Sequence, residues 1–222
     1  WFELGDPVLQ RLGDLDAILM RKDPPFATEY IYSTYILERA QDQGALVVND
    51  PRGLRDMNEK VYTAWFPQCC APTLVTRSEA DIREFHAQHG DIILKPLDGM
   101  GGMGIFKVGA DGLNLGAIVE TLNRGGQQTV MVQKFLPGIA KGDKRVLLIG
   151  GTPVPFCLAR IPQGGEVRGN LAAGGSGVAR PLTDRDQWIC EQIGPTLRAK
   201  EIHFAGLDVI GDSLTEINVT SP

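Results

Sequence analysis

The sequence predicts a fold of the mixed α/β and α+β class. Three observations lead to this prediction. Apolar runs of strand length alternate with segments of helical period, a glycine-rich loop joins two strand-like runs, and the last third of the chain closes with a hairpin-like stretch. Strands and helices that alternate in this way pack as sheets covered by helices.

Composition limits the classes of protein that are possible. The 222 residues are 43% hydrophobic and 22% charged, which is typical of a globular protein. No apolar run approaches the roughly 18 residues of a membrane span, and the first residues lack the basic and apolar pattern of a signal peptide. We therefore expect a cytoplasmic protein with no membrane association. Because the chain begins at Trp1 and stops at Pro222 directly after a strand-like run, we also expect a fragment that lacks both ends.

The net charge and the cysteine content limit the functions that are possible. A net charge of −5 argues against nucleic-acid binding, which needs a basic surface. Any anionic ligand must then meet a local cluster of basic groups. The four cysteines show neither zinc-ligand spacing nor a disulfide framework, so we expect reduced, structural thiols.

The elements fall into three groups along the chain. Residues 1–57 contain a strand, a helix and a second strand, and we interpret them as the remnant of an N-terminal α/β domain, with elements at 16–20, 28–43 and 46–48. Residues 58–135 form a compact α+β unit, with helices at 58–66, 78–89 and 114–123 and strands at 91–95, 105–108 and 129–133. Asn58 and Ser78 are the expected N-caps of its first two helices.

Residues 136–222 form the third group. Two strand-like runs, DKRVLLIGG and PVPFCLARI, are followed by residues 162–178, which contain six glycines and almost no periodicity. Such a segment inside a compact domain is either a functional lid or a linker. A helix at 183–200 precedes the closing hairpin.

The glycine-rich loop contains Gly99-x-Gly101-x-x-Gly104, which matches the dinucleotide-binding fingerprint. That fingerprint requires a helix after the loop, whereas GIFKV predicts a strand. We therefore expect a glycine loop between two antiparallel strands, the arrangement with which protein kinases cover ATP phosphates, or else a flexible hairpin. Lys95, at the end of the preceding strand, and Lys60 are candidate phosphate-binding cations.

The segment VMVQKFLPG, residues 130–138, ends an apolar strand at a proline. Between two lobes, its backbone could hydrogen-bond an adenine edge while Val132, Phe135 and Leu136 pack against the ring. A core strand is the alternative.

The closing hairpin, GLDVIGDSLTEIN, carries a candidate metal site. A three-residue turn at 211–213 pairs Ile210 with Leu214 and Asp208 with Glu216, and places Asn218 opposite Gly206. The two carboxylates and the amide then share one face, since side chains alternate with a period of two. Facing carboxylates repel unless a cation lies between them, and oxygen ligands of this kind suit Mg²⁺. The alternative is an exposed polar face.

These motifs resemble those of the ATP-grasp carboxylate-amine ligases, and among them the bacterial glutathione synthetase family. The resemblance rests on MRKDPPF, NEK, IILKPLDGMGG, GDKRVL, CLARIPQGGEVRGNLAAGG and GLDVIGDSLTEINVTSP, in that order, and it covers essentially the whole chain. It implies two α+β subdomains that hold ATP between them, at 58–135 and 136–222.

The resemblance also implies roles for individual residues. It implies Mg²⁺, with Mn²⁺ as the alternative ion, bound by Asp208, Glu216 and Asn218. ATP would contact Lys60, Lys95, Gly99, Gly101, Gly102, Gln133, Lys134, Phe135, Leu136 and Asn170. Arg145, Arg160 and Arg168 would be catalytic, the last on a loop at 162–178 that closes over the site.

The implied reaction joins γ-glutamylcysteine to glycine with ATP, giving glutathione, ADP and phosphate, in a homo-oligomer. Two alternatives stay open: another ATP-grasp ligase with a different acid or amine, and a nucleotide-binding module without catalysis.

Overall fold

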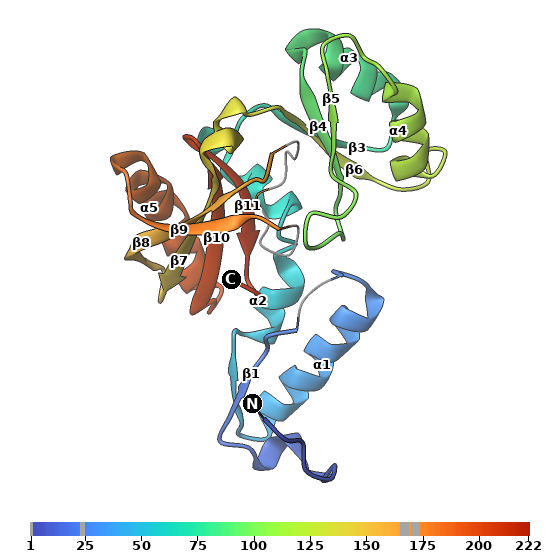
Figure 1. The fold of residues 1–222 in the computed structure, drawn as a ribbon. Helices are drawn as coiled ribbons and strands as arrows, with labels where there is room; N and C mark the ends of the chain where they lie inside the picture. Colours follow the sequence, from blue (N-terminus) through green and yellow to red (C-terminus); the bar gives the residue numbers. More distant parts are fainter. Residues whose placement is uncertain (1, 23–24, 165–168, 170–173) are drawn as a thin grey trace.

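The computed structural model describes residues 2–22, 25–164, 169 and 174–222, and it has three parts (Figure 1). The N-terminal part pairs β1 (Ala17–Leu19) in parallel with β2 (Leu46–Val48). Helix α1 (Thr28–Asp42) connects them, after the short 3₁₀ helix η1 (Leu12–Asp14). The predicted strand, helix and strand of this part are confirmed.

Helix α2 (Pro51–Asp56) follows directly, and the sequence interpretation missed it. The Asp50 carboxylate accepts hydrogen bonds from the backbone N–H groups of Arg52 and Gly53, at 2.9 and 3.0 Å. An acidic N-cap followed by proline at the first helical position is a start signal that the sequence contains.

The smaller of two antiparallel sheets has the strand order β3-β6-β4-β5. Its strands are β3 (Thr73–Thr76), β4 (Ile92–Pro96), β5 (Phe106–Val108) and β6 (Val130–Lys134). Helices α3 (Glu79–His89) and α4 (Leu115–Asn123) cover one face, where Ile82, Val119, Leu94 and Val132 form a core. Because side chains alternate along a strand, Ile93, Lys95 and Gln133 point to the opposite face.

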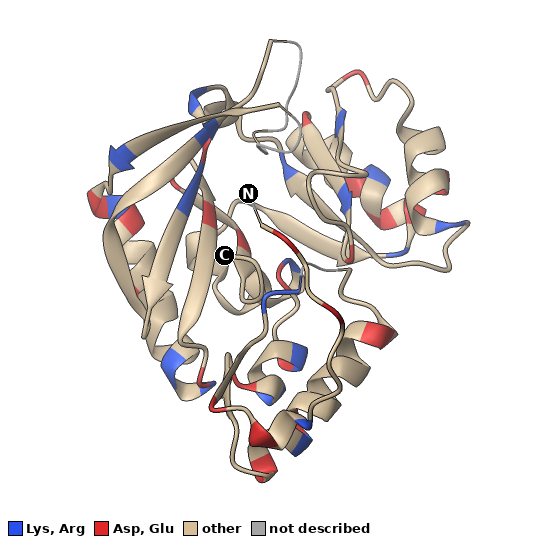
Figure 2. Ribbon diagram, turned by 60° about the horizontal axis from the view of Figure 1, so that its bottom comes forward, with Lys and Arg blue, Asp and Glu red and all other residues tan. Residues whose placement is uncertain are grey.

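The larger sheet has the order β11-β10-β7-β8-β9. Its strands are β7 (Asp143–Ile149), β8 (Thr152–Ile161), β9 (Ser176–Pro181), β10 (Phe204–Ile210) and β11 (Ser213–Asn218). Helix α5 (Asp184–Ala199) packs Ile193 and Leu197 against the apolar face, which includes Leu207 and Ile217. Figure 2 shows basic and acidic positions close together on neighbouring strands of this sheet.

The predicted turn of the last hairpin is wrong, although the predicted pairing of the functional residues is right. Ile210 pairs with Ser213, so the turn has two residues, Gly211 and Asp212, instead of three. A β-bulge between this turn and Asp208 then adds one residue to β11 and restores the register. Asp208 consequently lies opposite Glu216, and Gly206 lies opposite Asn218, as predicted.

Two further expectations need correction. The helix predicted at 58–66 is only the 3₁₀ helix η2 (Val61–Trp65), because the carbonyl of Glu59 accepts a hydrogen bond from Ile217 N–H of β11 (2.8 Å) instead of continuing a helix. Two more 3₁₀ helices, η3 (Pro67–Cys69) and η4 (Pro137–Lys141), connect the sheets. Strand β9 begins inside the predicted 162–178 loop. The glycine-rich sequence of that loop gave no strand signal.

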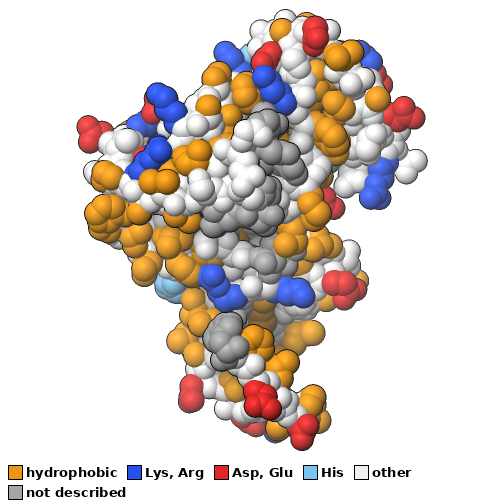
Figure 3. Space-filling model, viewed as in Figure 1, with side chains coloured by type: hydrophobic (Ala, Val, Ile, Leu, Met, Phe, Trp, Pro, Cys, Tyr) orange, Lys and Arg blue, Asp and Glu red, His pale blue; other side chains and the backbone are white. Residues whose placement is uncertain are grey.

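The surface shows no segregation of charge on the face drawn in Figure 3, where basic and acidic side chains are interspersed. Exposed hydrophobic side chains on the N-terminal part include Tyr32, Tyr35 and Ile36 of α1. Among the described residues, no helix combines the length and the apolar character needed to cross a bilayer. All four cysteines are free thiols, and three of them are buried.

The buried side chain of Asn49 joins the N-terminal part to the larger sheet. Its amide donates to the carbonyls of Phe204 (2.7 Å) and Val219 (2.6 Å) and accepts from the Phe204 N–H (2.8 Å). Asn49→Ala should lower the free energy of unfolding by about 3 kcal/mol, since it leaves these backbone groups without their partner. Urea denaturation would measure this loss. Gln88→Ala, which removes an exposed contact within α3, should change stability by less than about 0.5 kcal/mol, and equal losses in the two variants would contradict the prediction.

Candidate nucleotide and metal site

A cavity of about 320 Å³ lies between the two sheets, and it is lined by their charged faces. The smaller sheet contributes Ile93, Lys95 and Gln133, and the larger sheet contributes Asp143, Arg145, Asp208, Glu216 and Asn218. The glycine loop and the residues after β6 complete the lining. The helices cover the opposite face of each sheet, so alternation along the strands brings these side chains together.

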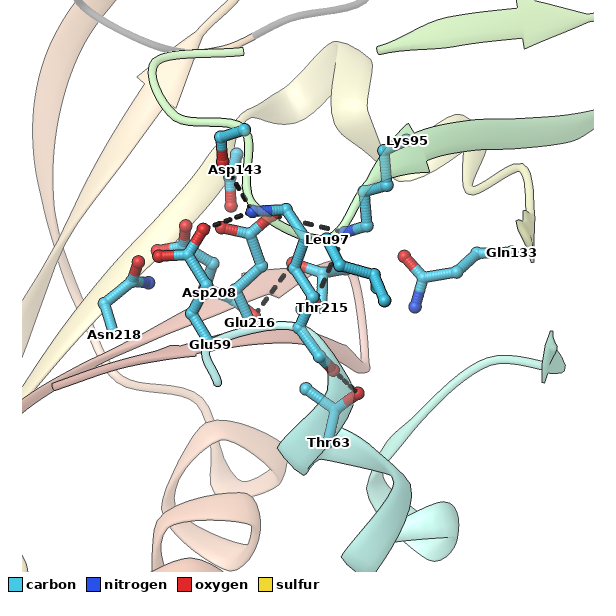
Figure 4. A network of polar contacts seen from close by, with 12 residues as sticks. Glu59, Thr63, Lys95, Leu97, Gln133, Asp143, Asp208, Thr215, Glu216 and Asn218 are labelled. Atoms are coloured by element: carbon cyan, nitrogen blue, oxygen red, sulfur yellow. Dashed lines mark hydrogen bonds and ion pairs between the residues drawn. The ribbon is translucent and has the colours of Figure 1, made fainter. Parts of the chain in front are cut away.

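Two lysines, Lys60 and Lys95, line the cavity, and Figure 4 shows Lys95. Lys95 Nζ lies 3.2 Å from Glu216 Oε1 and 3.4 Å from the carbonyl oxygen of Thr215. Lys60 Nζ lies 3.7 Å from the same Glu216 oxygen, donates to the carbonyl of Gly99 at 2.8 Å and is paired with Glu59. Both ammonium groups are almost fully buried, which requires the compensating carboxylates.

Two arginines gather around the other carboxylate. Arg160 Nη2 lies 2.9 Å from Asp208 Oδ2 and also pairs with Asp143. Arg145 holds Asp208 through both of its oxygens, and its Nη1 donates to the carbonyl of Ser221 at 2.9 Å. Asp143 Oδ1 and Arg160 Nε have no hydrogen-bond partner among the described residues. One acceptor, Asp143 Oδ1, and one donor, Arg160 Nε, are therefore available for hydrogen bonds that no described group of the protein makes.

Burial and charge shift the pKa values in opposite directions at neighbouring groups. Burial raises the pKa of Asp143 to about 7, and repulsion from Asp208 adds to this against the attraction of Arg160. Burial also opposes ionisation of Asp208, but Arg145 and Arg160 outweigh it, and the pKa of Asp208 is lowered. Burial and Glu216 raise the pKa of Glu59. Asp208 thus stays ionised beside carboxyl groups that hold their protons more readily.

The glycine loop approaches the cavity between β4 and β5, which pair in antiparallel fashion. The loop leads into a strand, as predicted, so the dinucleotide-fold interpretation is excluded. Gly101 and Gly102 have φ values of +60° and +80°, which favour glycine. Asn58 and Lys60 hold the loop from outside, since Asn58 Nδ2 donates to the Leu97 carbonyl at 3.1 Å and Lys60 donates to that of Gly99.

The segment after β6 lies as the sequence predicts, with one exception. Gln133, Lys134, Phe135 and Leu136 all line the cavity. Val132 does not, because it is fully buried under α3 and α4 in the core of the smaller sheet. The alternation that directs Gln133 into the cavity directs Val132 away from it.

The three predicted metal ligands share the cavity face of β10 and β11. Asn218 Nδ2 donates to the Gly206 carbonyl at 3.3 Å, so Oδ1 is the end of the amide that could accept a metal ion. No group of three or more His, Cys, Asp or Glu side chains among the described residues is arranged to hold a metal ion. Mg²⁺ commonly takes only one or two protein carboxylates, with water and phosphate oxygens as its other ligands. Two facing carboxylates and one amide oxygen fit that requirement.

Two predicted site residues, Arg168 and Asn170, lie outside the described residues. Gly169 between them is described, and it lines the cavity. A Cβ at this position would lie 2.4 Å from the Arg160 carbonyl oxygen, so only glycine permits this approach.

Two charged residues of the cavity lining, Glu59 and Asp143, were not predicted as site residues. Glu59 directly follows the expected N-cap Asn58, where an acidic residue also suits the first turn of a helix, so its position gave no sign of the cavity. Asp143 could have been found, because it lies two residues before Arg145 and a strand places such residues on one face.

The fold is shared with solved structures of low sequence identity. D-cycloserine synthetase DcsG matches with a TM-score of 0.72 over 96% of this chain and 78% of that chain, at 14% identity. The RiPP-associated ATP-grasp ligase of Chryseobacterium gregarium, solved with ADP and a leader and core peptide, matches with a TM-score of 0.68 over 95% of this chain and 70% of that chain, at 16% identity. The protein therefore has the ATP-grasp fold.

The sequence comparisons identify the family. Residues 59–222 match the model of the prokaryotic glutathione synthetase ATP-grasp domain, and residues 1–55 match the model of the N-terminal domain of the same family. Glutathione synthetase of Pseudomonas putida is 62% identical, and that of Salmonella typhimurium is 60% identical, over all 222 residues, which span 70% of each relative. The chain belongs to the prokaryotic glutathione synthetase family, whose members are ATP-grasp ligases.

The shifted pKa of Asp143 predicts a stability that depends on pH. Its folded-state pKa of about 7 lies above the ordinary value of 3.8. The stabilisation from the bound proton is therefore fully present below about pH 4 and is lost as pH rises through 7. Asp143→Asn should remove this loss, so the free energy of unfolding of the variant, relative to wild type, should rise by roughly 2–4 kcal/mol between pH 4 and 8.

Urea denaturation at a series of pH values would measure this difference. Asp42→Asn, which changes an exposed ion pair on α1, is the matched control and should keep the wild-type slope. An unchanged slope in Asp143→Asn would contradict the prediction.

Proposed function

We propose that the cavity binds Mg-ATP and that the protein uses it to join γ-glutamylcysteine to glycine. The observation that carries this proposal is the pair of facing carboxylates, Asp208 and Glu216, set between two lysines and two arginines. Phosphates, a divalent cation and a carboxylate substrate can each find a partner of opposite charge there.

The proposed nucleotide position follows from the polarity of the lining. Adenine would lie against Ile93 and the 133–136 segment, where Phe135 and Leu136 supply apolar surface. The phosphates would lie under the loop that contains Gly99, Gly101 and Gly102, next to Lys60 and Lys95. These lysines now neutralise Glu59 and Glu216, so an incoming phosphate would exchange one anionic partner for another.

That exchange is the reason to assign the metal to the hairpin. Once phosphates attract the lysines, Glu216 needs another cation, and together with Asp208 and Asn218 it would hold Mg²⁺. The ion, when bound, supplies neutralisation of charge on the phosphate oxygens. The PsnB ligase structure with Mg and ADP has the same fold, with a TM-score of 0.62 over 85% of this chain and 58% of that chain, at 22% identity.

The arginines define the proposed reaction centre. The cysteinyl carboxylate would attack the γ-phosphorus and release ADP, and the glycine amine would then attack the acyl carbon and release phosphate. Arg145 and Arg160, which both pair with Asp208, would bind the anionic groups in both steps, and Asp143, which pairs with Arg160, would orient it. Water competes with the amine for an acyl phosphate, so the site must exclude it. We propose that the loop at 162–178, which contains Arg168 and Asn170, excludes water from the site.

The division into an N-terminal remnant at 1–57 and two ATP-grasp subdomains at 58–135 and 136–222 is part of this proposal. The two separate sheets, each with its own helices, support the second boundary. A homo-oligomer is likewise proposed from the family resemblance, and sedimentation of the full-length protein would test it.

The reaction itself can be tested by ADP release from the full-length protein, with γ-glutamylcysteine and glycine each supplied or withheld. We expect ADP only at a background rate unless both are present, because coupling needs the acceptor amine. Turnover with another acid and amine, but not with this pair, would overturn the assignment and favour a different ATP-grasp ligase. No turnover with intact nucleotide binding would favour a binding module.

The metal assignment can be tested with Glu216→Gln in the full-length protein. This change keeps the shape of the side chain but removes a carboxylate, and turnover of the folded variant should fall by a factor on the order of 100. Glu120→Gln, on the exposed face of α4, is the control and should retain wild-type turnover. Near-normal activity of Glu216→Gln would exclude Glu216 as a ligand.

A further inference from the structure

The turn between β10 and β11 is held by two cations on the side away from the cavity. Lys144 Nζ donates to the carbonyl of Gly211 at 2.9 Å. Arg185 Nε donates to the carbonyl of Asp212 at 3.0 Å. These are the two consecutive residues of the turn, so both of its carbonyls are occupied by charged donors.

Both cations are anchored at the start of helix α5. Lys144 is paired with Asp186, which is fully buried and forms the capping box of this helix with Thr183. Arg185 lies over the Trp188 ring at 4.2 Å, and its Nη2 donates to the Gln68 carbonyl at 3.0 Å. The turn is therefore attached to a rigid element at two points and cannot move without breaking charged hydrogen bonds.

The turn and the bulge next to it together decide which side chains face the cavity. A two-residue turn alone would pair Asp208 with Thr215 and direct Glu216 to the opposite face, since a shift of one residue exchanges the faces of a strand. The bulge corrects this, and Thr215 Oγ1 bonds there to the Asp208 carbonyl at 3.1 Å. The proposed metal site therefore requires the bulged register, because this two-residue turn without the bulge would direct Glu216 away from the cavity.

We propose that Arg185 and Lys144 are positioning residues for metal binding, because they fix the turn and with it the bulged register that sets Asp208 opposite Glu216. Neither residue is in the cavity lining. The inference rests on the proposed Mg²⁺ site at Asp208, Glu216 and Asn218. It differs from a general contribution to stability because it predicts an effect on the metal that is separable from an effect on folding.

The test is Arg185→Gln in the full-length protein, with ATP binding measured by calorimetry over a series of Mg²⁺ concentrations. The half-saturating Mg²⁺ concentration should rise roughly tenfold, as for other residues that orient metal ligands. Binding of ATP without Mg²⁺ should stay within twofold of wild type. Arg185→Lys, which keeps a donor, should restore at least half of the loss on a logarithmic scale.

Arg198→Gln is the matched control. Arg198 is on the same helix and also donates from its guanidinium to a backbone carbonyl, that of Gly151 at 3.3 Å, but at the other end of α5. It should leave the Mg²⁺ dependence unchanged. Amide hydrogen exchange of residues 208–218 without metal provides a second readout, and it should accelerate in Arg185→Gln and not in Arg198→Gln.

The outcomes separate this inference from the metal assignment. If Glu216→Gln alters the Mg²⁺ dependence and folded Arg185→Gln does not, the positioning role is wrong and the metal site stands. If neither variant alters it, the metal site itself is wrong. Lys144→Met is the second variant, and wild-type Mg²⁺ dependence in folded Lys144→Met would overturn the positioning role even if Arg185→Gln failed to fold.

Discussion

The repulsion between two facing carboxylates governs how this protein is built. Asp208 and Glu216 are direct neighbours across an antiparallel strand pair, where like charges destabilise a sheet. Each is neutralised from a different direction, Asp208 by arginines of its own sheet and Glu216 by lysines from outside it. The close approach of these two carboxylates explains why four cations converge on one cavity.

The two sheets meet this requirement with the same design. Each has one face buried under helices and one face left for charge, and a period of two along the strands separates the two roles. Sequence-distant residues such as Lys95 and Glu216 can therefore meet without either side chain entering a hydrophobic core. The chemistry of the site depends on the space between the sheets, while the stability of each part depends on the cores behind them.

Much of this site could be predicted from the sequence, because alternation assigns faces. The shared face of Asp208, Glu216 and Asn218 followed from spacing alone, although the turn was wrong and the bulge compensated for it. The spacing of residues along the sequence cannot predict which side chains of distant segments become neighbours in the fold. The pairing of Arg145 with Asp208 depends on which strands become neighbours. Strand β9 was missed because its sequence, SGVARP, has a single β-branched residue beside residues of low strand propensity.

The bond from Lys95 of the smaller sheet to Glu216 of the larger one has a consequence for nucleotide affinity. A phosphate that binds Lys95 must first compete with a carboxylate already in place, and the same is true of Lys60. The observed affinity is then lower than the contacts alone would give, by the free energy of the pairs that are broken. The Lys95–Glu216 pair also connects the two sheets, so the arrival of the ligand loosens one connection between them as it forms another.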